Sequence, residues 1–323
     1  MGRLAIGAPA AALLAACGSS PLTGATTTAP VRIGYLSPGF PSPFLDIFRQ
    51  TLRDLGYIEG QSVAFDFRFA AGQDERLSEL AAELKNQRKA DILMALGGTA
   101  TEAAKQAAPN TPIVFIRVGD PVGTGLVESL ATPGGFATGL TSFAPQLIGK
   151  RLEILNAAVP YARRVLTLWD AGHPTAEELD ILNRAAGMLR LDVSHAEVPG
   201  TTDFEEAIAG TGGADALLIF LEDVTFNQRR RILSFANKSK LPTLYPIREF
   251  VDDGGLLSYG PVQEEQFKRA AVFVDKIVKG SQPWQLPIEQ PIRFELVINS
   301  KAAKAIGADI SVPLLMQADE VVR

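Results

Sequence analysis

The sequence has 323 residues, 46% of them hydrophobic, and at the usual ~100 to 200 residues per domain this length predicts two lobes. Charge is nearly balanced, with 31 Lys and Arg against 36 Asp and Glu and a formal net charge of -5. This balance excludes the strongly basic surface that a nucleic-acid backbone requires, so we expect no nucleic-acid partner.

Residues 1–17 have the form of a lipoprotein signal peptide. An Ala/Leu-rich stretch ends in Leu14-Ala15-Ala16-Cys17, and Cys17 is the only cysteine of the chain. We expect cleavage before Cys17 and lipidation of its thiol, which would anchor the protein to a membrane. The alternative is an ordinary Ala-rich helix with a chance cysteine. Residues 18–30, rich in Ser, Thr, Gly and Pro, predict a flexible linker, and no later stretch reaches the ~20 apolar residues of a membrane span.

From Val31 onward, short apolar runs alternate with amphipathic stretches, which is typical of parallel sheets with crossover helices. Five strands are predicted in the first part, at 31–36, 62–69, 91–96, 112–118 and 136–140. Helices are predicted at 44–55, after Asp74, in the Ala-rich stretch up to Ala108, and in a short segment at 126–130. This pattern predicts one complete doubly wound lobe.

The alternation then restarts and predicts a second lobe of the same kind. Its strands are expected at 163–169, 191–198, 214–221, 241–245, 256–259 and 292–298, and its helices at 146–158, 175–189, 204–209 and 225–238. A further helix is expected at 263–279. We expect crossings between lobes near Thr141, Tyr259 and Pro287, so that lobe 1 comprises 31–141 plus 260–286 and lobe 2 comprises 142–259 plus 287–323. The predicted fold class is α/β, with two doubly wound parallel-sheet lobes joined by a multi-strand hinge.

In open α/β sheets a ligand lies beyond the carboxyl ends of the strands, so residues that follow the strands are the candidate ligand contacts. In lobe 1 these are Ser37, Phe44, Gly98, Thr99, Thr101, Asp120, Thr141 and Ser142. Hydroxyl groups and free backbone N–H groups at helix starts predict a site for a carboxylate or another anion. Alternatively, Thr99 and Thr101 are plain helix caps.

In lobe 2 the corresponding positions carry aromatic and charged side chains. The candidates are Trp169, Asp170, Glu222, Tyr245, Arg248 and Tyr259. The aromatic rings would form apolar walls, while Arg248 or the acids would hold a charged end of the ligand. The alternative is that each aromatic ring belongs to the hydrophobic core.

Motifs that carry catalysis are absent from the sequence. It contains no G-x-S-x-G elbow, no phosphate-binding loop ending in Lys-Ser/Thr and no His pair at metal-ligand spacing, since His173 and His195 are the only histidines. We therefore expect no enzyme activity, no metal and no cofactor.

Several segments, in order, resemble the ABC-transporter substrate-binding proteins of the tryptophan/phenylalanine-binding type. They are the stretches 33–37 (IGYLS), 52–61 (LRDLGYIEGQ), 118–123 (VGDPVG), 254–260 (GGLLSYG), 299–307 (NSKAAKAIG) and 318–321 (ADEV). The resemblance implies the periplasmic-binding fold of type I and, by position, a pocket that involves Ser37, Thr99, Asp120, Thr141, Ser142, Glu222, Arg248 and Tyr259. The Pro-rich loop 38–43 is peculiar to this chain, so the ligand is not inherited with the fold.

These observations predict an extracytoplasmic, periplasmic lipoprotein that captures a small carboxylate-bearing ligand, amino-acid-like or aromatic, by closure of its lobes. Its expected partners are that ligand, the permease subunits of an ABC importer and, through Cys17, a membrane, and the protein is expected to be a monomer. Two alternatives remain open: a lipoprotein of the same fold that signals to a sensor kinase, and an extracytoplasmic enzyme with a doubly wound core.

Overall fold

A computed structural model describes residues 1–2, 29–142, 144–169, 175–198, 213–220 and 223–323. Lobe 1 is built on a five-stranded parallel sheet in the order β2-β1-β3-β4-β5. The strands are β1 (Val31–Ser37), β2 (Val63–Phe69), β3 (Ile92–Leu96), β4 (Ile113–Val118) and β5 (Ala137–Thr141). Strands β3, β4 and β5 are buried along their whole length and β1 along most of it, as expected for a sheet that is covered on both faces, whereas the edge strand β2 is only partly buried.

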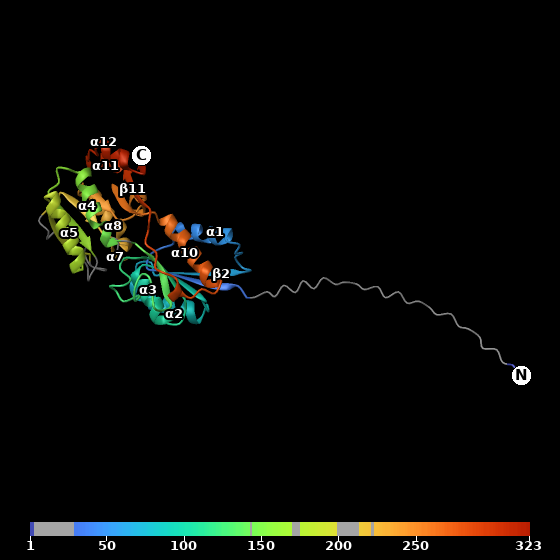
Figure 1. The fold of residues 1–323 in the computed structure, drawn as a ribbon. Helices are drawn as coiled ribbons and strands as arrows, with labels where there is room; N and C mark the ends of the chain where they lie inside the picture. The colour runs from blue at the N-terminus through green and yellow to red at the C-terminus, as the bar shows by residue number, and fades with distance from the viewer. Residues whose placement is uncertain (3–28, 143, 170–174, 199–212, 221–222) are drawn as a thin grey trace.

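Helices cover both faces of this sheet. Helices α1 (Phe44–Asp54) and α10 (Gln263–Val278) pack on one face, where Phe48 and Phe267 join a cluster with Ile33. The short 3-10 helix η1 (Asp74–Arg76) leads into α2 (Leu77–Asn86), which covers the other face together with α3 (Gly98–Ala107). Figure 1 shows α10, in orange, beside α1, in blue, although the two helices are far apart in the sequence. The chain therefore returns to lobe 1 after much of lobe 2 is complete.

Lobe 2 has a seven-stranded sheet in the order β7-β6-β8-β9-β10-β11-β12. Its strands are β6 (Arg164–Trp169), β7 (Asp192–Glu197), β8 (Ala216–Ile219), β9 (Thr243–Tyr245), β10 (Leu257–Pro261), β11 (Phe294–Asn299) and β12 (Glu320–Val322). The first five strands repeat the order of lobe 1, and β11 runs antiparallel to β10. The predicted fold class is thus confirmed; the strand expected at 292–298 is β11, and its antiparallel direction differs from the predicted parallel sheet.

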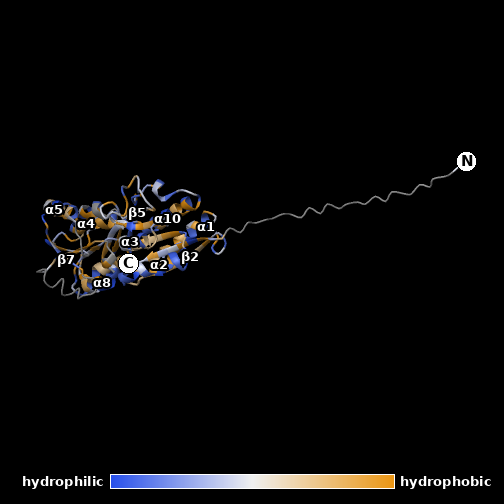
Figure 2. Ribbon diagram, turned by 90° about the horizontal axis from the view of Figure 1, so that it is seen from below, coloured by the Kyte–Doolittle hydropathy of each residue, from blue (hydrophilic) through white to orange (hydrophobic). Residues whose placement is uncertain are grey.

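The helices of lobe 2 lie around this sheet, and hydrophobic residues of α4 and α5 join one core cluster with β6. They are α4 (Ala144–Ala158), α5 (Ala176–Leu189), α7 (Asp223–Asn227), α8 (Arg229–Lys238), α9 (Glu249–Asp252), α11 (Ser300–Ile306) and α12 (Val312–Gln317). Figure 2 shows helices with both hydrophobic and hydrophilic faces around strands that are mainly hydrophobic. No helix in the described part of the chain is both long enough and apolar enough to span a membrane.

The chain passes between the two sheets at three places in the described residues: between β5 and α4, between β10 and α10, and before β11. The last passage follows Glu289, because Leu140 and Glu289 form a bridge and the Ile288 N–H donates to Leu130 O at 2.7 Å. The short 3-10 helix η2 (Pro283–Gln285) precedes this point. Gly260 and Pro261 belong to β10 in the sheet of lobe 2, so the expected boundary at 259/260 falls inside a strand.

Some local predictions differ from the structure. Residues 126–130 form bends instead of the expected short helix. They follow a turn at 121–125 in which the carboxylate of Asp120 accepts from the N–H groups of Val122 and Gly123. The sequence analysis also did not predict α9, α11, α12 or β12. The helix expected at 204–209 lies outside the described residues.

Candidate functional site

Residues that follow β1 and β2 of lobe 1 meet helix α7 of lobe 2. A Cβ atom built on Gly39 would lie 3.3 Å from Asn227 Oδ1 and 3.4 Å from Phe226 Cε1. Asn227 Nδ2 donates to Asp74 Oδ1 at 3.4 Å. The two lobes are thus in contact along the edge where open α/β sheets bind ligands.

Arg117 is the most unusual residue at this edge. It lies near the carboxyl end of β4, where the β4–β5 register shifts between Ile116 and Val118, and it has a φ of 67°. A bulge of this kind turns one side chain away from the regular alternation of the strand. The guanidinium carbon of Arg117 lies 4.4 Å from the ring centroid of Phe226 in lobe 2. Arg117 is 7% exposed, and no hydrogen bond or ion pair joins its side chain to any residue that the structure describes.

Phe226 gives the contact between the lobes an apolar centre. A second guanidinium, that of Arg229, lies 4.8 Å from the same ring centroid and is paired with Asp253 at 2.8 Å. Phe250 approaches Phe226 edge-on, with ring centroids 6.4 Å apart. Cations over an aromatic face are favourable, and more so when water is excluded.

Buried polar atoms without hydrogen-bond partners occur on both sides of this contact. Lobe 1 contributes Tyr35 Oη, Thr141 Oγ1 and Ser142 Oγ. Lobe 2 contributes Asn227 Oδ1 and Glu249 Oε2. Each buried polar group without a partner costs about 1 to 3 kcal/mol, so a polar ligand that supplied the missing partners here would recover that cost.

The electrostatics link three of these side chains. Burial raises the pKa of Glu249, and the positive charge of Arg117 opposes that rise. Burial also raises the pKa of Tyr35, again opposed by Arg117. The positive charge of Arg117 therefore acts on the ionisation of a phenol in lobe 1 and of a carboxyl group in lobe 2.

The other candidates of lobe 1 are held by local contacts. Ser37 Oγ accepts from the Gly39 N–H at 3.2 Å, and Thr101 Oγ1 donates to Gly97 O at 2.6 Å. Asp120 is exposed and caps the following turn. Phe44 stacks on Phe267, with ring centroids 5.7 Å apart.

Gly98 and Thr99 occupy the first turn of α3, and Gly97 precedes them with a φ of 85°. Thr141 and Ser142 remain the two lobe 1 candidates whose hydroxyl groups are buried without a partner. They lie where β5 ends, one strand away from Arg117.

In lobe 2, two of the three candidate aromatic residues lie in the hydrophobic core. Trp169 is 1% exposed, stacks on Phe220 with ring centroids 3.7 Å apart, and donates from Nε1 to Thr167 Oγ1 at 2.6 Å. Tyr245 is equally buried and stacks on Phe250 at 4.9 Å. Tyr259 is only partly buried. Trp169 and Tyr245 are therefore core residues, which was the alternative interpretation of the aromatic residues at strand ends.

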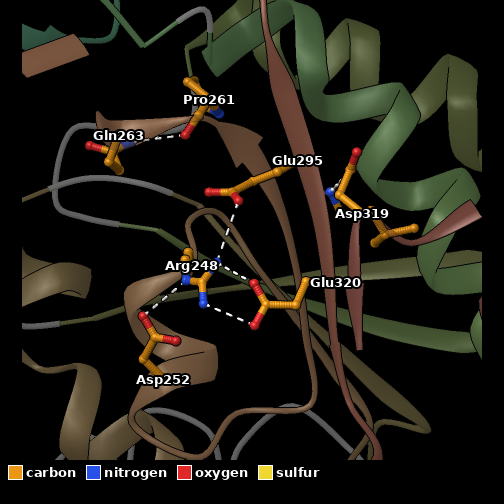
Figure 3. A network of polar contacts seen from close by, with 8 residues as sticks. Arg248, Asp252, Pro261, Gln263, Glu295, Asp319 and Glu320 are labelled. Carbon is orange, nitrogen blue, oxygen red and sulfur yellow. Dashed lines mark hydrogen bonds and ion pairs between the residues drawn. The ribbon is translucent and has the colours of Figure 1, made fainter. Parts of the chain in front are cut away.

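Arg248, the candidate cation of lobe 2, is held by carboxylates of its own lobe. Its Nη1 lies 2.6 Å from Glu320 Oε2 on β12, and its Nε lies 3.3 Å from Asp252 Oδ2 (Figure 3). Glu295 on β11 is 3.8 Å away. The hydrogen bond to Glu320 raises the pKa of Arg248. These contacts join β12 to α9, and they leave the guanidinium of Arg248 engaged within lobe 2.

A second buried arginine, Arg151 on α4, holds the ends of two strands of lobe 2. It is 1% exposed, and it donates from Nε to Tyr259 O at 2.9 Å and from Nη2 to Pro246 O at 3.2 Å. Burial lowers its pKa to about 10. Arg151 therefore holds β10 in position directly before the chain passes to lobe 1.

Asp170, Glu222 and Cys17 lie outside the described residues, so their predicted roles stay predictions. In the described ranges, no group of three or more His, Cys, Asp or Glu side chains is arranged to hold a metal ion. The sequence analysis did not select Tyr35, Arg117 or Asn227. A signal for Arg117 was present, because it is the one charged residue in the apolar run 113–118 (IVFIRV).

Comparison with known proteins is consistent with this geometry. A tyrosine-binding protein of Clostridioides difficile (strain R20291) is 24% identical over 261 residues, which span 80% of this chain and 75% of the relative. The structure of an ABC domain from Streptococcus pneumonia in complex with L-Trp has a TM-score of 0.81 and 23% identity, covering 91% of this chain and 100% of the other. A conserved domain protein from Vibrio cholerae has the same TM-score and coverage at 24% identity.

The family model for ABC transporter substrate binding proteins matches residues 45–322, which include nearly all of both lobes. The resemblance found in the sequence is therefore confirmed, and the fold is that of the type I periplasmic-binding proteins. This chain belongs to the ABC transporter substrate-binding protein family.

Proposed function

We propose that this protein captures a small carboxylate-bearing ligand with an apolar or aromatic body between its lobes and delivers it to the permease of an ABC importer. The observation that carries the proposal is the set of buried, unpartnered polar groups contributed by both lobes, together with the unpaired guanidinium of Arg117 beside Phe226. A ligand that supplies the missing partners gains their hydrogen bonds without the cost of displacing existing protein contacts.

Closure of the lobes follows from the same geometry. A ligand that contacts both lobes stabilises the closed arrangement by the contacts that the open arrangement lacks. The passages of the chain between the lobes allow such a rotation while keeping the two sheets intact. The closed shape is what the permease would recognise, and capture and release require no bond to be made or broken.

Substrate-binding proteins of ABC transporters are extracytoplasmic, and family membership assigns the chain to that location. The tyrosine-binding relative and the L-Trp complex support an aromatic amino acid as the first ligand to test. Phe226 beside an unpaired cation suits such a ligand, because an aromatic body and a carboxylate are both accommodated.

The test is a thermal-unfolding screen of the purified mature chain against amino acids, aromatic acids, sugars and divalent cations. A ligand at 100 times its dissociation constant stabilises the protein by about 2.7 kcal/mol, which is a measurable shift in Tm. Stabilisation by amino acids or aromatic acids is the expected result, and stabilisation by sugars or metal ions alone would contradict the proposal.

Transport is tested separately, by uptake of the labelled ligand in cells with and without the gene. Loss of uptake on deletion is expected for an importer component. Unchanged uptake with altered gene expression would instead indicate that the protein senses the ligand for a kinase.

Membrane attachment through Cys17 is part of the same proposal and rests on the sequence that precedes it. Cys17→Ser removes the thiol that would carry the lipid, so the variant is expected in the periplasmic fraction while the wild type is expected with the membranes. Equal distribution of both forms would contradict the lipid anchor. We expect both forms to be monomeric.

A further inference from the structure

The three passages of the chain between the lobes are hydrogen-bonded to one another. The Glu289 N–H donates to Gly139 O at 3.0 Å, and the Thr141 N–H donates to Glu289 O at 3.0 Å, so the first and the last passage lie side by side. The Val262 N–H donates to Arg293 O at 3.1 Å, which joins the second passage to the last one. The hinge is therefore one connected unit, and a contact that bridges it acts on the rotation of both lobes.

Helix α10 holds the last passage at both of its ends through ion pairs. Arg269 of α10 pairs with Glu289, with Nε 2.7 Å from Oε2, at the end that is bonded to the sheet of lobe 1. One helical turn earlier, Glu265 pairs with Arg293, which directly precedes β11 in the sheet of lobe 2. Residues four apart lie on the same face of a helix, so one face of α10 presents a carboxylate and a guanidinium to the two ends of the passage.

The Glu265–Arg293 pair differs from the other ion pairs in what it joins. Of the ion pairs between residues that the structure describes, it is the one whose partners belong to different lobes. Glu265 is fixed in α10, which packs on the sheet of lobe 1. Arg293 moves with lobe 2, because the next residue, Phe294, is paired with Pro261 of β10. Rotation of the lobes therefore changes the distance between the two charged side chains.

The pair is formed in the arrangement in which the lobes are in contact, with Asn227 donating to Asp74. The side chain of Glu265 is 33% exposed and that of Arg293 is 69% exposed, so water and salt reach both. A partly exposed ion pair contributes a modest free energy, and salt screens it. A modest free energy is sufficient to shift the balance between two arrangements of the lobes that differ by little.

We propose that the Glu265–Arg293 pair is a salt-sensitive latch that stabilises the closed arrangement of the lobes in the absence of ligand. The latch acts before any ligand binds, so it lies beyond the proposed function. It raises the apparent affinity for any ligand that contacts both lobes, because closure then costs less of the binding free energy. Rising salt weakens the pair and opens the lobes.

Small-angle X-ray scattering of the ligand-free mature chain measures the opening. For the wild type, we expect the radius of gyration to increase from low salt to about 1 M salt, where the Debye length is about 3 Å. Glu265→Gln and Arg293→Gln each remove the pair, so each should have the larger radius of gyration already at low salt and should no longer respond to salt. The expected change in the ratio of open to closed molecules is about 2- to 5-fold.

Charge reversal gives a larger signal and its own rescue. Arg293→Glu places two carboxylates against each other, so we expect it to open the lobes further than Arg293→Gln does, and we expect salt to reduce the difference. The double variant Glu265→Arg/Arg293→Glu restores opposite charges in exchanged positions and should return the radius of gyration to the wild-type value. A thermal-unfolding scan shows that each variant is folded, and if Arg293→Glu is not, Arg293→Gln decides.

Glu264→Gln is the matched control. Glu264 is the neighbouring residue of α10, and it pairs with Lys268 within lobe 1. Glu264→Gln and Glu265→Gln change the net charge equally, so an effect of overall charge would appear in both. We expect Glu264→Gln to keep the wild-type radius of gyration and the wild-type response to salt.

Three results would refute the latch. They are a wild-type radius of gyration for the pair-removing variants at low salt, further closure of the lobes when the pair is removed, and an equal response of Glu264→Gln and Glu265→Gln. None of these measurements uses a ligand, so the latch can fail while the proposed function stands. Failure of the ligand screen, in turn, leaves the scattering result unchanged.

Discussion

Asn227 of lobe 2 donates a hydrogen bond from Nδ2 to Asp74 Oδ1 of lobe 1 at 3.4 Å, while its own Oδ1 is buried without a partner. The side-chain amide of Asn227 thus joins the lobes through Nδ2, while Oδ1 has no hydrogen-bond partner. This pairing marks the contact that must separate when the lobes open.

Asn227→Asp replaces the donor at this contact with a second carboxylate. Like charges at this distance repel, so we expect the ligand-free variant to be more open and to have a larger radius of gyration by small-angle X-ray scattering. High salt should reduce the difference, because it screens exposed charges. The double variant Asp74→Asn/Asn227→Asp removes the repulsion and serves as the control, and an unchanged scattering profile for the single variant would contradict this role of Asn227.

Gly39 sets how closely lobe 1 approaches α7. A Cβ there would already lie 3.3 Å from Asn227 Oδ1, so the branched side chain of Gly39→Val forces the lobes apart. We expect ligand affinity to fall by about 10-fold, equivalent to about 1.4 kcal/mol, with little change in Tm since each lobe folds as before. Gly135→Val is the control, because a Cβ at Gly135 meets no atom within 4 Å. Equal affinity for both variants would show that this approach does not limit closure.

Glu249→Gln should stabilise the ligand-free protein at neutral and alkaline pH. Burial raises the pKa of Glu249 above its ordinary value of 4.5, so the native state holds the proton to higher pH than the unfolded chain does. The stability that this group contributes is fully present below 4.5 and is lost as pH rises through the raised pKa. The charges that act on it are Arg117, Asp252 and Arg229.

Chemical denaturation of wild type and Glu249→Gln in a series of buffers of increasing pH measures this dependence. The advantage of the variant should appear as pH rises and should vanish at low pH, where wild-type Glu249 is protonated. A constant difference across the range would show that Glu249 does not titrate in the native state.

Arg151→Ala is expected to destabilise the protein by about 3 kcal/mol, because it removes a buried side chain and leaves the carbonyl groups of Tyr259 and Pro246 without their donor. Urea denaturation measures the loss. Arg151→Lys retains one donor and should recover part of the lost stability. A loss below about 0.5 kcal/mol for Arg151→Ala would instead show that water replaces the arginine as donor to those carbonyl groups.

The sequence determined the architecture of this protein because the signals for it are local. Apolar runs such as 92–96 and 113–118 bury their side chains wherever they pair, and helices such as α1 show their buried face at positions three and four residues apart. Alternation of these elements predicts parallel sheets, and the restart after Thr141 predicts the second lobe. The antiparallel direction of β11 could not be predicted in the same way, because it depends on where the chain enters the sheet of lobe 2 after α10.

The site was decided by tertiary structure. Trp169 and Tyr245 follow the expected rule of lying near strand ends, yet both are packed in the core, because burial of a large ring is favourable wherever the neighbouring helices leave room. Thr141 and Ser142 were selected from the sequence and do carry buried, unpartnered hydroxyl groups. Arg117 took its position from a register shift between β4 and β5, which depends on the partner strand.

Residue order alone therefore establishes which segments form strands, helices and lobes, since hydrophobic burial acts on short patterns along the chain. Which polar groups remain without partners is a property of the packed molecule, because Arg117 meets Phe226 only when β4 of one lobe faces α7 of the other. No pattern within either segment records that contact.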